Sequence, residues 1–258
     1  MTVPRSVTAP DWSRWLRGWD EQQESFNPDR ERRFTTMLDV LEAQLGRRFT
    51  ALDLGSGPGS LSVRILRRFP KSRVVAVDYD PVVRRIGEGA LGSVGGRLTW
   101  IDAQLGRPGW AAVLPRRRYD AAVSTTALHW LTPLQLTRVY SDIGRILRRG
   151  GVFLNGDYIP DGRSARELRR LGDRVRKIRF PKSGSSAEWG AWTRWWQGAR
   201  RVPALRAEFA EHDRRSASHP TRRDLSLEFH VRRLKAAGFR TTAVVWQDLQ
   251  NRVLYARR

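Results

Sequence analysis

The most constraining feature of the chain is the run from Ala51 to Asp80, which reads as a strand, a glycine loop, a helix and a second strand. An apolar stretch leads into three glycines separated by single residues, Gly55, Gly57 and Gly59. A tight turn here needs backbone angles that glycine adopts readily, and glycine lets the backbone approach a ligand closely. With a helix over 61–68 and a strand over 74–77, the run predicts half of a nucleotide-binding α/β unit.

Acidic residues stand at both ends of this unit. Asp53 heads the glycine loop, where a carboxylate repels phosphate and suits a ligand that carries an ammonium group. Asp78 ends the second strand, 19 residues beyond Gly59, where it can accept hydrogen bonds from both hydroxyls of a ribose. The usual dinucleotide pattern, G-x-G-x-x-G, binds pyrophosphate instead. We therefore expect a nucleoside ligand without phosphate, the alternative being a turn that only joins a strand to a helix.

Length and composition restrict the remaining possibilities. A chain of 258 residues suits one α/β domain with an insertion better than two independent domains. The absence of cysteine excludes disulfides, thiolate metal sites and cysteine nucleophiles. The N-terminus has no apolar core of signal-peptide length, and no apolar run reaches membrane-spanning length, so we expect a cytoplasmic protein without a membrane partner.

The formal net charge of +22 has three explanations that the sequence leaves open. A strongly basic surface attracts polyanions, which favours a nucleic-acid partner. Lysine occupies only positions 71, 177, 182 and 235, so a GC-rich genome would produce the same excess of arginine. An acidic small-molecule substrate is the third explanation.

The order of the other elements predicts a parallel sheet. Apolar residues recurring at three and four positions predict helices over 11–18 and 28–45. After Asp78 we expect a helix from Pro81 to about Ala90, a helix from Pro133 that ends at Gly150-Gly151, and strands over 97–101, 119–124 and 152–157. Strand and helix alternate throughout, as in a doubly wound α/β sheet.

The pattern changes after the fifth strand. Residues 158–223 contain arginine runs and a tryptophan cluster but no convincing strand, which indicates a helical insertion or lid. A helix over 225–237, capped by Asp224 and ended by Gly238, then precedes two strands over 241–246 and 252–256.

These motifs resemble a known family. The loop from Asp53 to Gly59 resembles the first motif of the class I S-adenosylmethionine (SAM)-dependent methyltransferases, and LKAAGF…VVWQDL…RVLYARR resembles their last helix and antiparallel hairpin. The segment ALHW at 127–130 resembles the trans-aconitate methyltransferase-like small-molecule branch. The resemblance implies a mostly parallel seven-stranded Rossmann-like sheet. It covers a SAM-binding core over 46–157 and 224–258 and implies a helical cap over 1–45. The helical insertion over 158–223 lies outside the resemblance, and we expect it to cover the acceptor.

The resemblance also implies roles for matching residues. Asp53 and the backbone of the loop would hold the methionine part of SAM, Asp78 the ribose, and Tyr79 would pack on the adenine. Asp102 would accept from the adenine amino group and the N–H of Ala103 would donate to a ring nitrogen, although an acid after a strand is also an ordinary turn residue. The full set of predicted cofactor-binding residues is Asp53, Gly55, Ser56, Gly57, Gly59, Asp78, Tyr79, Asp102, Ala103 and Ser124.

Acceptor residues are expected after the fourth strand. His129 would act as a general base if the acceptor is a hydroxyl or an amine, or else pack the rim with Trp130. A carboxylate acceptor needs no base but needs cationic anchors, for which arginines of the insertion are candidates: Arg163, Arg166, Arg169, Arg170, Arg174, Arg176 and Arg179. Candidate substrate contacts are Trp130, Trp19, Trp192 and Trp196, and a buried lid core explains the last two equally well.

The predicted function is transfer of a methyl group from SAM to oxygen or nitrogen of a small, acidic or aromatic acceptor. The sulfonium leaving group is already activated, so catalysis can come from in-line positioning of the acceptor, with no metal. Methylation of tRNA or rRNA and a non-catalytic SAM-binding protein are the alternatives. The oligomeric state is not predicted.

Overall fold

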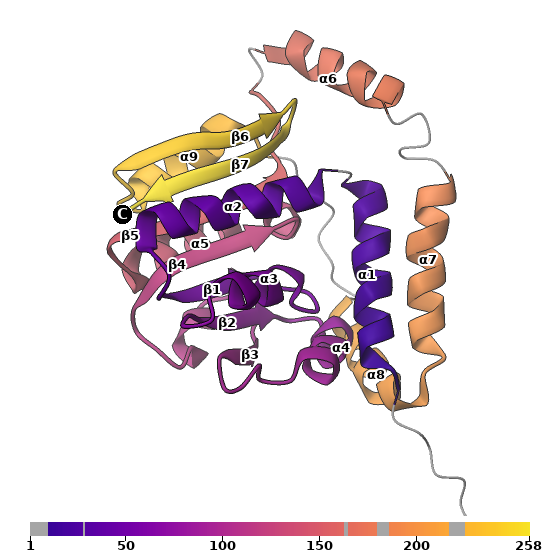
Figure 1. Cartoon of the computed structure of the whole chain (residues 1–258). Coiled ribbons are helices and arrows are strands. Elements are labelled where there is room, and N and C mark those ends of the chain that lie inside the picture. Colours follow the sequence, from indigo (N-terminus) through magenta and orange to yellow (C-terminus); the bar gives the residue numbers. More distant parts are fainter. Residues whose placement is uncertain (1–9, 28, 163–164, 180–185, 217–224) are drawn as a thin grey trace, which may run out of the picture.

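The protein is described here by a computed structural model that covers residues 10–27, 29–162, 165–179, 186–216 and 225–258 (Figure 1). Seven strands form one sheet in the order β3-β2-β1-β4-β5-β7-β6, and β7 alone runs antiparallel to both of its neighbours. The strands are β1 (Thr50–Leu54), β2 (Arg73–Asp78), β3 (Leu98–Asp102), β4 (Tyr119–Thr125), β5 (Leu147–Tyr158), β6 (Thr241–Asp248) and β7 (Asn251–Arg257). The predicted fold class, a doubly wound and mostly parallel sheet, is confirmed.

Helices cover both faces of the sheet. The α-helices are α1 (Trp12–Phe26), α2 (Arg30–Leu45), α3 (Ser60–Arg68), α4 (Pro81–Leu91), α5 (Pro133–Ile146), α6 (Arg166–Arg179), α7 (Ser186–Arg200), α8 (Arg206–Ser216) and α9 (Leu227–Ala236). Apolar side chains of α2 and α3 pack on one face, and those of α5 and α9 pack on the other. Strands such as β4 are buried on both faces, as the run Ala121-Ala122-Val123 predicts.

A third apolar cluster lies beyond the sheet. Helix α1 from the N-terminus and helices α7 and α8 from the insertion pack with α4, next to the edge where the parallel strands end (Figure 1). Trp195 of α7 meets Trp15 and Trp19 of α1 edge to face, with ring centroids 5.9 and 5.1 Å apart. The described part of the insertion is mainly helical, as its sequence predicts, and its helices α7 and α8 cover this edge together with α1.

Three predicted boundaries were wrong. The first helix continues past Gly18 to Phe26, because Gly18 lies against Trp195 and gives the helix its packing partner. Helix α5 ends at Ile146, since Leu147 pairs with Tyr119 and already belongs to β5. Helix α9 begins later than predicted and is capped by Ser226, whose hydroxyl accepts from the N–H of Phe229. Asp224, the predicted cap, lies outside the described residues, whereas Gly238 follows the helix with φ +90°, as expected.

None of the helices in the ranges that the structure covers combines the length and the apolar composition that a bilayer span requires.

Candidate active site

The glycine loop joins β1 to α3 and has the backbone that the sequence predicts. Gly55 and Gly59 have φ angles of +68° and +86°, which favour glycine. A Cβ on Gly55 would lie 2.4 Å from the Cβ of Ala127, and a Cβ on Gly59 would lie 2.7 Å from Trp100. The loop is therefore closely packed against Ala127 and Trp100, and any residue larger than glycine at position 55 or 59 would displace it.

Asp53 is a buried carboxylate with spare hydrogen-bonding capacity. Its Oδ2 accepts from the hydroxyl of Ser62 at 2.6 Å, and its Oδ1 has no hydrogen-bond partner among the residues that the structure describes. Burial, with a contribution from the negative charge of Asp78, raises the pKa of Asp53 to about 7. A cation at the free oxygen would compensate for this burial.

Asp78 ends β2 beside the same loop. Its Oδ2 accepts from the N–H of Gly57 at 2.7 Å and its Oδ1 accepts from the N–H of Asp80 at 2.9 Å. Burial raises its pKa to about 6, and the charge of Asp80 acts in the same direction. Each carboxylate oxygen can accept a second hydrogen bond, so both remain available to a pair of hydroxyl groups.

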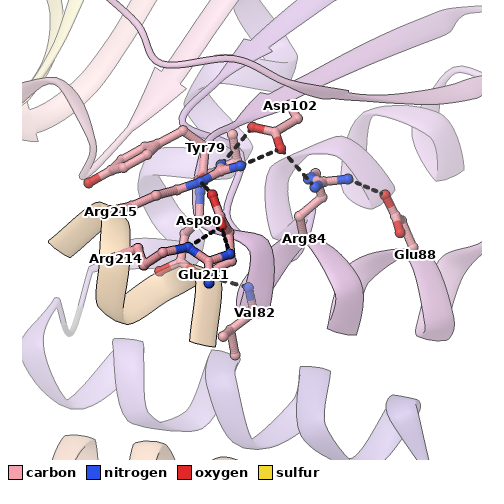
Figure 2. A network of polar contacts seen from close by, with 10 residues as sticks. Tyr79, Asp80, Val82, Arg84, Glu88, Asp102, Glu211, Arg214 and Arg215 are labelled. Carbon is pink, nitrogen blue, oxygen red and sulfur yellow. Dashed lines mark hydrogen bonds and ion pairs between the residues drawn. The ribbon is translucent and has the colours of Figure 1, made fainter. Parts of the chain in front are cut away.

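Asp102 ends β3 and is held by arginines (Figure 2). The two terminal nitrogens of Arg215, on α8, donate to its two carboxylate oxygens at 2.8 and 2.9 Å, and Arg84 donates to Oδ2 at 3.1 Å. Arg215 also donates to the carbonyl of Tyr79, and burial raises the pKa of the Tyr79 phenol to about 12. The insertion thus reaches the strand ends through α8, a contact that the sequence did not predict.

We expect Asp102→Asn to loosen the docking of α8. Asparagine has no charge and presents only one acceptor oxygen, so the two-point contact with Arg215 is lost. Amide hydrogens of residues 206–216 should exchange about tenfold faster, as measured by mass spectrometry. Asp173→Asn, at an exposed position on α6, is the control and should leave this exchange unchanged. Equal exchange rates in the wild type and Asp102→Asn would contradict the role of this ion pair.

Two predicted backbone and hydroxyl donors are already engaged within the protein. The N–H of Ala103 donates to the carbonyl of Asp78 at 3.3 Å, and the hydroxyl of Ser124 donates to the carbonyl of Leu54 at 2.7 Å. The Ala103 N–H extends the β2–β3 pairing, which leaves its predicted bond to a ring nitrogen without support. Ser56 is buried within the loop, and its N–H donates to the carbonyl of Val77.

His129 follows β4 and pairs with an acid from β5. Its Nδ1 lies 2.8 Å from Oδ1 of Asp157, and both side chains are over nine-tenths buried. Because an ionised carboxylate only accepts, Nδ1 carries the proton and Nε2 is the basic nitrogen. Thr126, just before this segment, has φ +48°, a strained angle for a β-branched residue. This strained turn directs the segment that carries His129.

The structure separates the predicted tryptophans into two places. Trp19 lies over the glycine loop, and a Cβ on Gly57 would lie 3.6 Å from its ring. Trp192 and Trp196 of α7 lie in the same aromatic cluster, with Trp196 6.4 Å from Trp19 between ring centroids. Trp130 lies elsewhere, beside His129, and is 45 % exposed.

Most of the arginines considered as acceptor anchors lie on α6. Helix α6 lies beyond the β6–β7 hairpin, away from the glycine loop (Figure 1), and Arg179 pairs there with Asp248 at 2.8 Å. The side chains of Arg166, Arg169, Arg170 and Arg174 are exposed, and Arg163 lies outside the described residues. Helix α6 contacts the turn between β6 and β7, where Gln250 donates to the carbonyl of Leu168. The role of these arginines as acceptor anchors stays a prediction.

A doubly wound sheet with a glycine loop and acids at the ends of three neighbouring strands defines a Rossmann-like nucleoside-binding domain. The fold is similar to that of a putative O-methyltransferase from Nostoc punctiforme, with a TM-score of 0.56 and 16% sequence identity over 100% of this chain and 64% of that one.

Sequence comparison is more specific. Residues 51–151 match the model of the methyltransferase domain family. The chain is 33% identical over 135 residues to trans-aconitate 2-methyltransferase of Azoarcus sp. (strain BH72), covering 52% of this chain and 48% of that one. It is 31% identical over 120 residues to malonyl-[acyl-carrier protein] O-methyltransferase of Geobacter sulfurreducens, covering 45% of this chain and 41% of that one.

The match over residues 51–151 agrees with the resemblance to SAM-dependent methyltransferases and with SAM as the predicted cofactor. The chain spans about half the length of the curated relatives it matches.

Proposed function

We propose that the chain is a SAM-dependent methyltransferase that acts on oxygen or nitrogen of a small molecule. The observation that carries this proposal is the pair Asp53 and Asp78 on neighbouring strands beside the glycine loop, with one buried oxygen of Asp53 unpartnered. Asp53 suits the ammonium group of SAM and Asp78 suits its ribose hydroxyls, so these residues fit the cofactor. Bound SAM supplies a methyl group on a positively charged sulfur, and this sulfur is a good leaving group when the methyl group is transferred.

The cofactor's other contacts follow from the same edge of the sheet. The loop backbone, Ser56 included, would hold the methionine part, and Tyr79 and Asp102 would hold the adenine. Arg215 and Arg84 fix the orientation of the Asp102 carboxylate. Trp19 over Gly57 would shield the loop from water.

His129 and Asp157 would serve the acceptor. Asp157 fixes the imidazole so that Nε2 can take a proton from a hydroxyl or amine as it becomes methylated. Trp130 would form the exposed rim of the acceptor site, and Trp192 and Trp196 would cover the cofactor loop from the insertion together with Trp19. The printed names of the two relatives, a trans-aconitate and a malonyl-group methyltransferase, support a small or carrier-bound acidic acceptor.

The proposal is tested by incubating the protein with methyl-labelled SAM and a host extract separated into small-molecule, RNA and protein fractions. Label in the small-molecule fraction supports the proposal and supplies the product for identification. Label in nuclease-sensitive material would show that the acceptor is RNA and not a small molecule. SAM binding without transfer in all fractions would favour a non-catalytic binding protein.

We expect Asp78→Ala to weaken SAM binding about 10- to 100-fold in isothermal titration calorimetry, because two hydrogen bonds to the ribose are lost. Asp78→Asn retains one acceptor oxygen, so its affinity for SAM should lie between those of the wild type and Asp78→Ala. Circular dichroism must show that both variants are folded, since Asp78 also accepts from Gly57 and Asp80. Unchanged affinity in the folded alanine variant would remove Asp78 from its proposed role.

A further inference from the structure

Helix α6 of the insertion carries an apolar stripe that the rest of the protein leaves largely uncovered. Leu168, Leu171, Val175 and Ile178 follow one another at intervals of three and four residues, so they lie along one side of the helix. Leu168, Leu171 and Ile178 are 57 %, 45 % and 79 % exposed. A single exposed apolar residue needs no explanation, but three on one stripe indicate a surface that contacts something else.

The remainder of α6 is strongly basic. The helix contains six arginines and one lysine against two acids, a net charge of +5. Arg170 and Arg174 are exposed and lie one turn apart, and Arg174 lies one turn before Ile178. Glu167, one turn before Leu171, is the acid of this helix that lies nearest to the stripe. Positive charges therefore border the apolar residues along most of their length.

The helix is attached to the body of the protein from one side. Gly172 is buried, and a Cβ there would overlap the side-chain amide of Gln250, in the turn between β6 and β7. Gln250 donates to the carbonyl of Leu168, and Arg179 pairs with Asp248 at the end of β6 at 2.8 Å. Figure 1 shows α6 at the outside of the molecule, past this turn. These contacts hold the helix in place and leave most of the apolar stripe accessible.

A helix attached in this way fits a flat partner better than a groove. A protein that binds a basic amphipathic helix in a groove surrounds it, and here the β6–β7 turn occupies one side. Single-stranded nucleic acid is bound by aromatic side chains that stack on bases, and α6 has none. An anionic lipid bilayer provides both complements in one plane, phosphate charges for the arginines and acyl chains for the apolar stripe.

We propose that α6 lies in the surface of an anionic lipid bilayer, with Leu171 and Ile178 among the acyl chains and Arg170 and Arg174 at the phosphates. A helix that lies in the plane of the surface needs no apolar run of spanning length. The absence of such a run, on which the expected lack of a membrane partner rests, therefore does not test this mode of binding. The proposal is independent of the methyl acceptor, because α6 lies outside the matched residues 51–151.

The test is co-sedimentation with vesicles of phosphatidylcholine and phosphatidylglycerol in a three-to-one ratio, compared with vesicles of pure phosphatidylcholine. We expect the wild type to bind the anionic vesicles at least about tenfold more tightly. The formal net charge of +22 attracts anions to the whole surface, so each variant needs a control of equal charge. Arg174→Glu should weaken binding about tenfold or more, whereas Arg117→Glu, at an exposed position before β4, should weaken it less than about threefold.

Insertion of the apolar stripe is tested by changes that leave the charge unaltered. Ile178→Ser should weaken binding to anionic vesicles about tenfold, because the serine side chain gains little on leaving water. Leu134→Ser, 61 % exposed on α5, is the matched control and should bind as the wild type does. Both positions are exposed, so we expect both variants to fold, which circular dichroism checks.

Four results would overturn the proposal. The first is an absence of binding to anionic vesicles. The second is equal weakening by Arg174→Glu and Arg117→Glu with no effect of Ile178→Ser, which would show attraction by the net charge alone. The third is a dimer in analytical ultracentrifugation that Ile178→Ser dissociates, which would assign the stripe to a second copy of the chain. The fourth is slower amide hydrogen exchange in α6 with tRNA but not with vesicles, which would assign the helix to nucleic acid.

Discussion

Replacing Asp53 by asparagine is expected to change how the stability of the ligand-free protein depends on pH. The pKa of Asp53 is about 7 in the folded protein and near 3.8 when unfolded, so the folded state binds more protons between these values. Its contribution to the free energy of unfolding is fully present below about pH 4 and is lost as the pH rises through about 7. The loss is on the order of 4 kcal/mol, at about 1.4 kcal/mol for each pKa unit.

The variant isolates this contribution from others. Burial lowers the pKa of His230 to about 4, which makes stability rise with pH in part of the same range, so the wild-type profile alone mixes opposite effects. Urea unfolding at several pH values should show that the wild type minus Asp53→Asn difference falls steadily from pH 4 to 7. Asp173→Asn, exposed on α6, should give a constant difference.

Ligand binding gives a second check on the same carboxylate. If the ammonium group of SAM lies at the free oxygen of Asp53, binding favours the ionised form, and SAM affinity should rise as the pH increases toward 7. Asp53→Asn should weaken SAM binding and flatten this pH dependence. If the difference in unfolding free energy between the wild type and Asp53→Asn does not vary with pH, this would contradict the burial of an unpaired carboxylate at Asp53.

Much of the cofactor half of the site was predictable because it depends on local sequence. The glycine loop needs positive φ angles and close packing, and both requirements restrict residue type at fixed spacing. Asp78 and Asp102 were found because parallel strands present their carboxyl ends at one edge. Asp157 ends the fifth predicted strand and obeys the same rule, so it could have been found in this way.

The rest of the site depends on contacts between distant parts of the chain. Arg215 reaches Asp102 across 113 positions, and nothing in the local pattern of a helical insertion marks one arginine among many. The end of α5 was misplaced for a similar reason, since pairing of Leu147 with Tyr119 outweighs its local helical pattern.

Replacing His129 by alanine is expected to lower kcat for methyl transfer about 10²- to 10⁴-fold, with little change in SAM affinity. The imidazole is the only titratable side chain that we assign to the acceptor proton, and general bases contribute rate factors of this size. Asp157→Asn should have a smaller effect in the same direction, because asparagine can still contact the ring but no longer fixes which nitrogen is protonated. The measurement uses the acceptor identified by the labelling experiment, with kcat determined across pH.

The shape of the pH profile distinguishes catalysis from packing. A base must be unprotonated to act, so the pH profile of the wild-type rate should contain a limb that rises with pH, and this limb should disappear in His129→Ala. Leu134→Ala, 61 % exposed on α5, is a control for nonspecific disturbance and should retain the wild-type profile. A His129→Ala enzyme that keeps most of its rate would show that the nucleophile needs no base. A carboxylate oxygen as the methylated atom would then account for the rate, because it is already ionised at neutral pH.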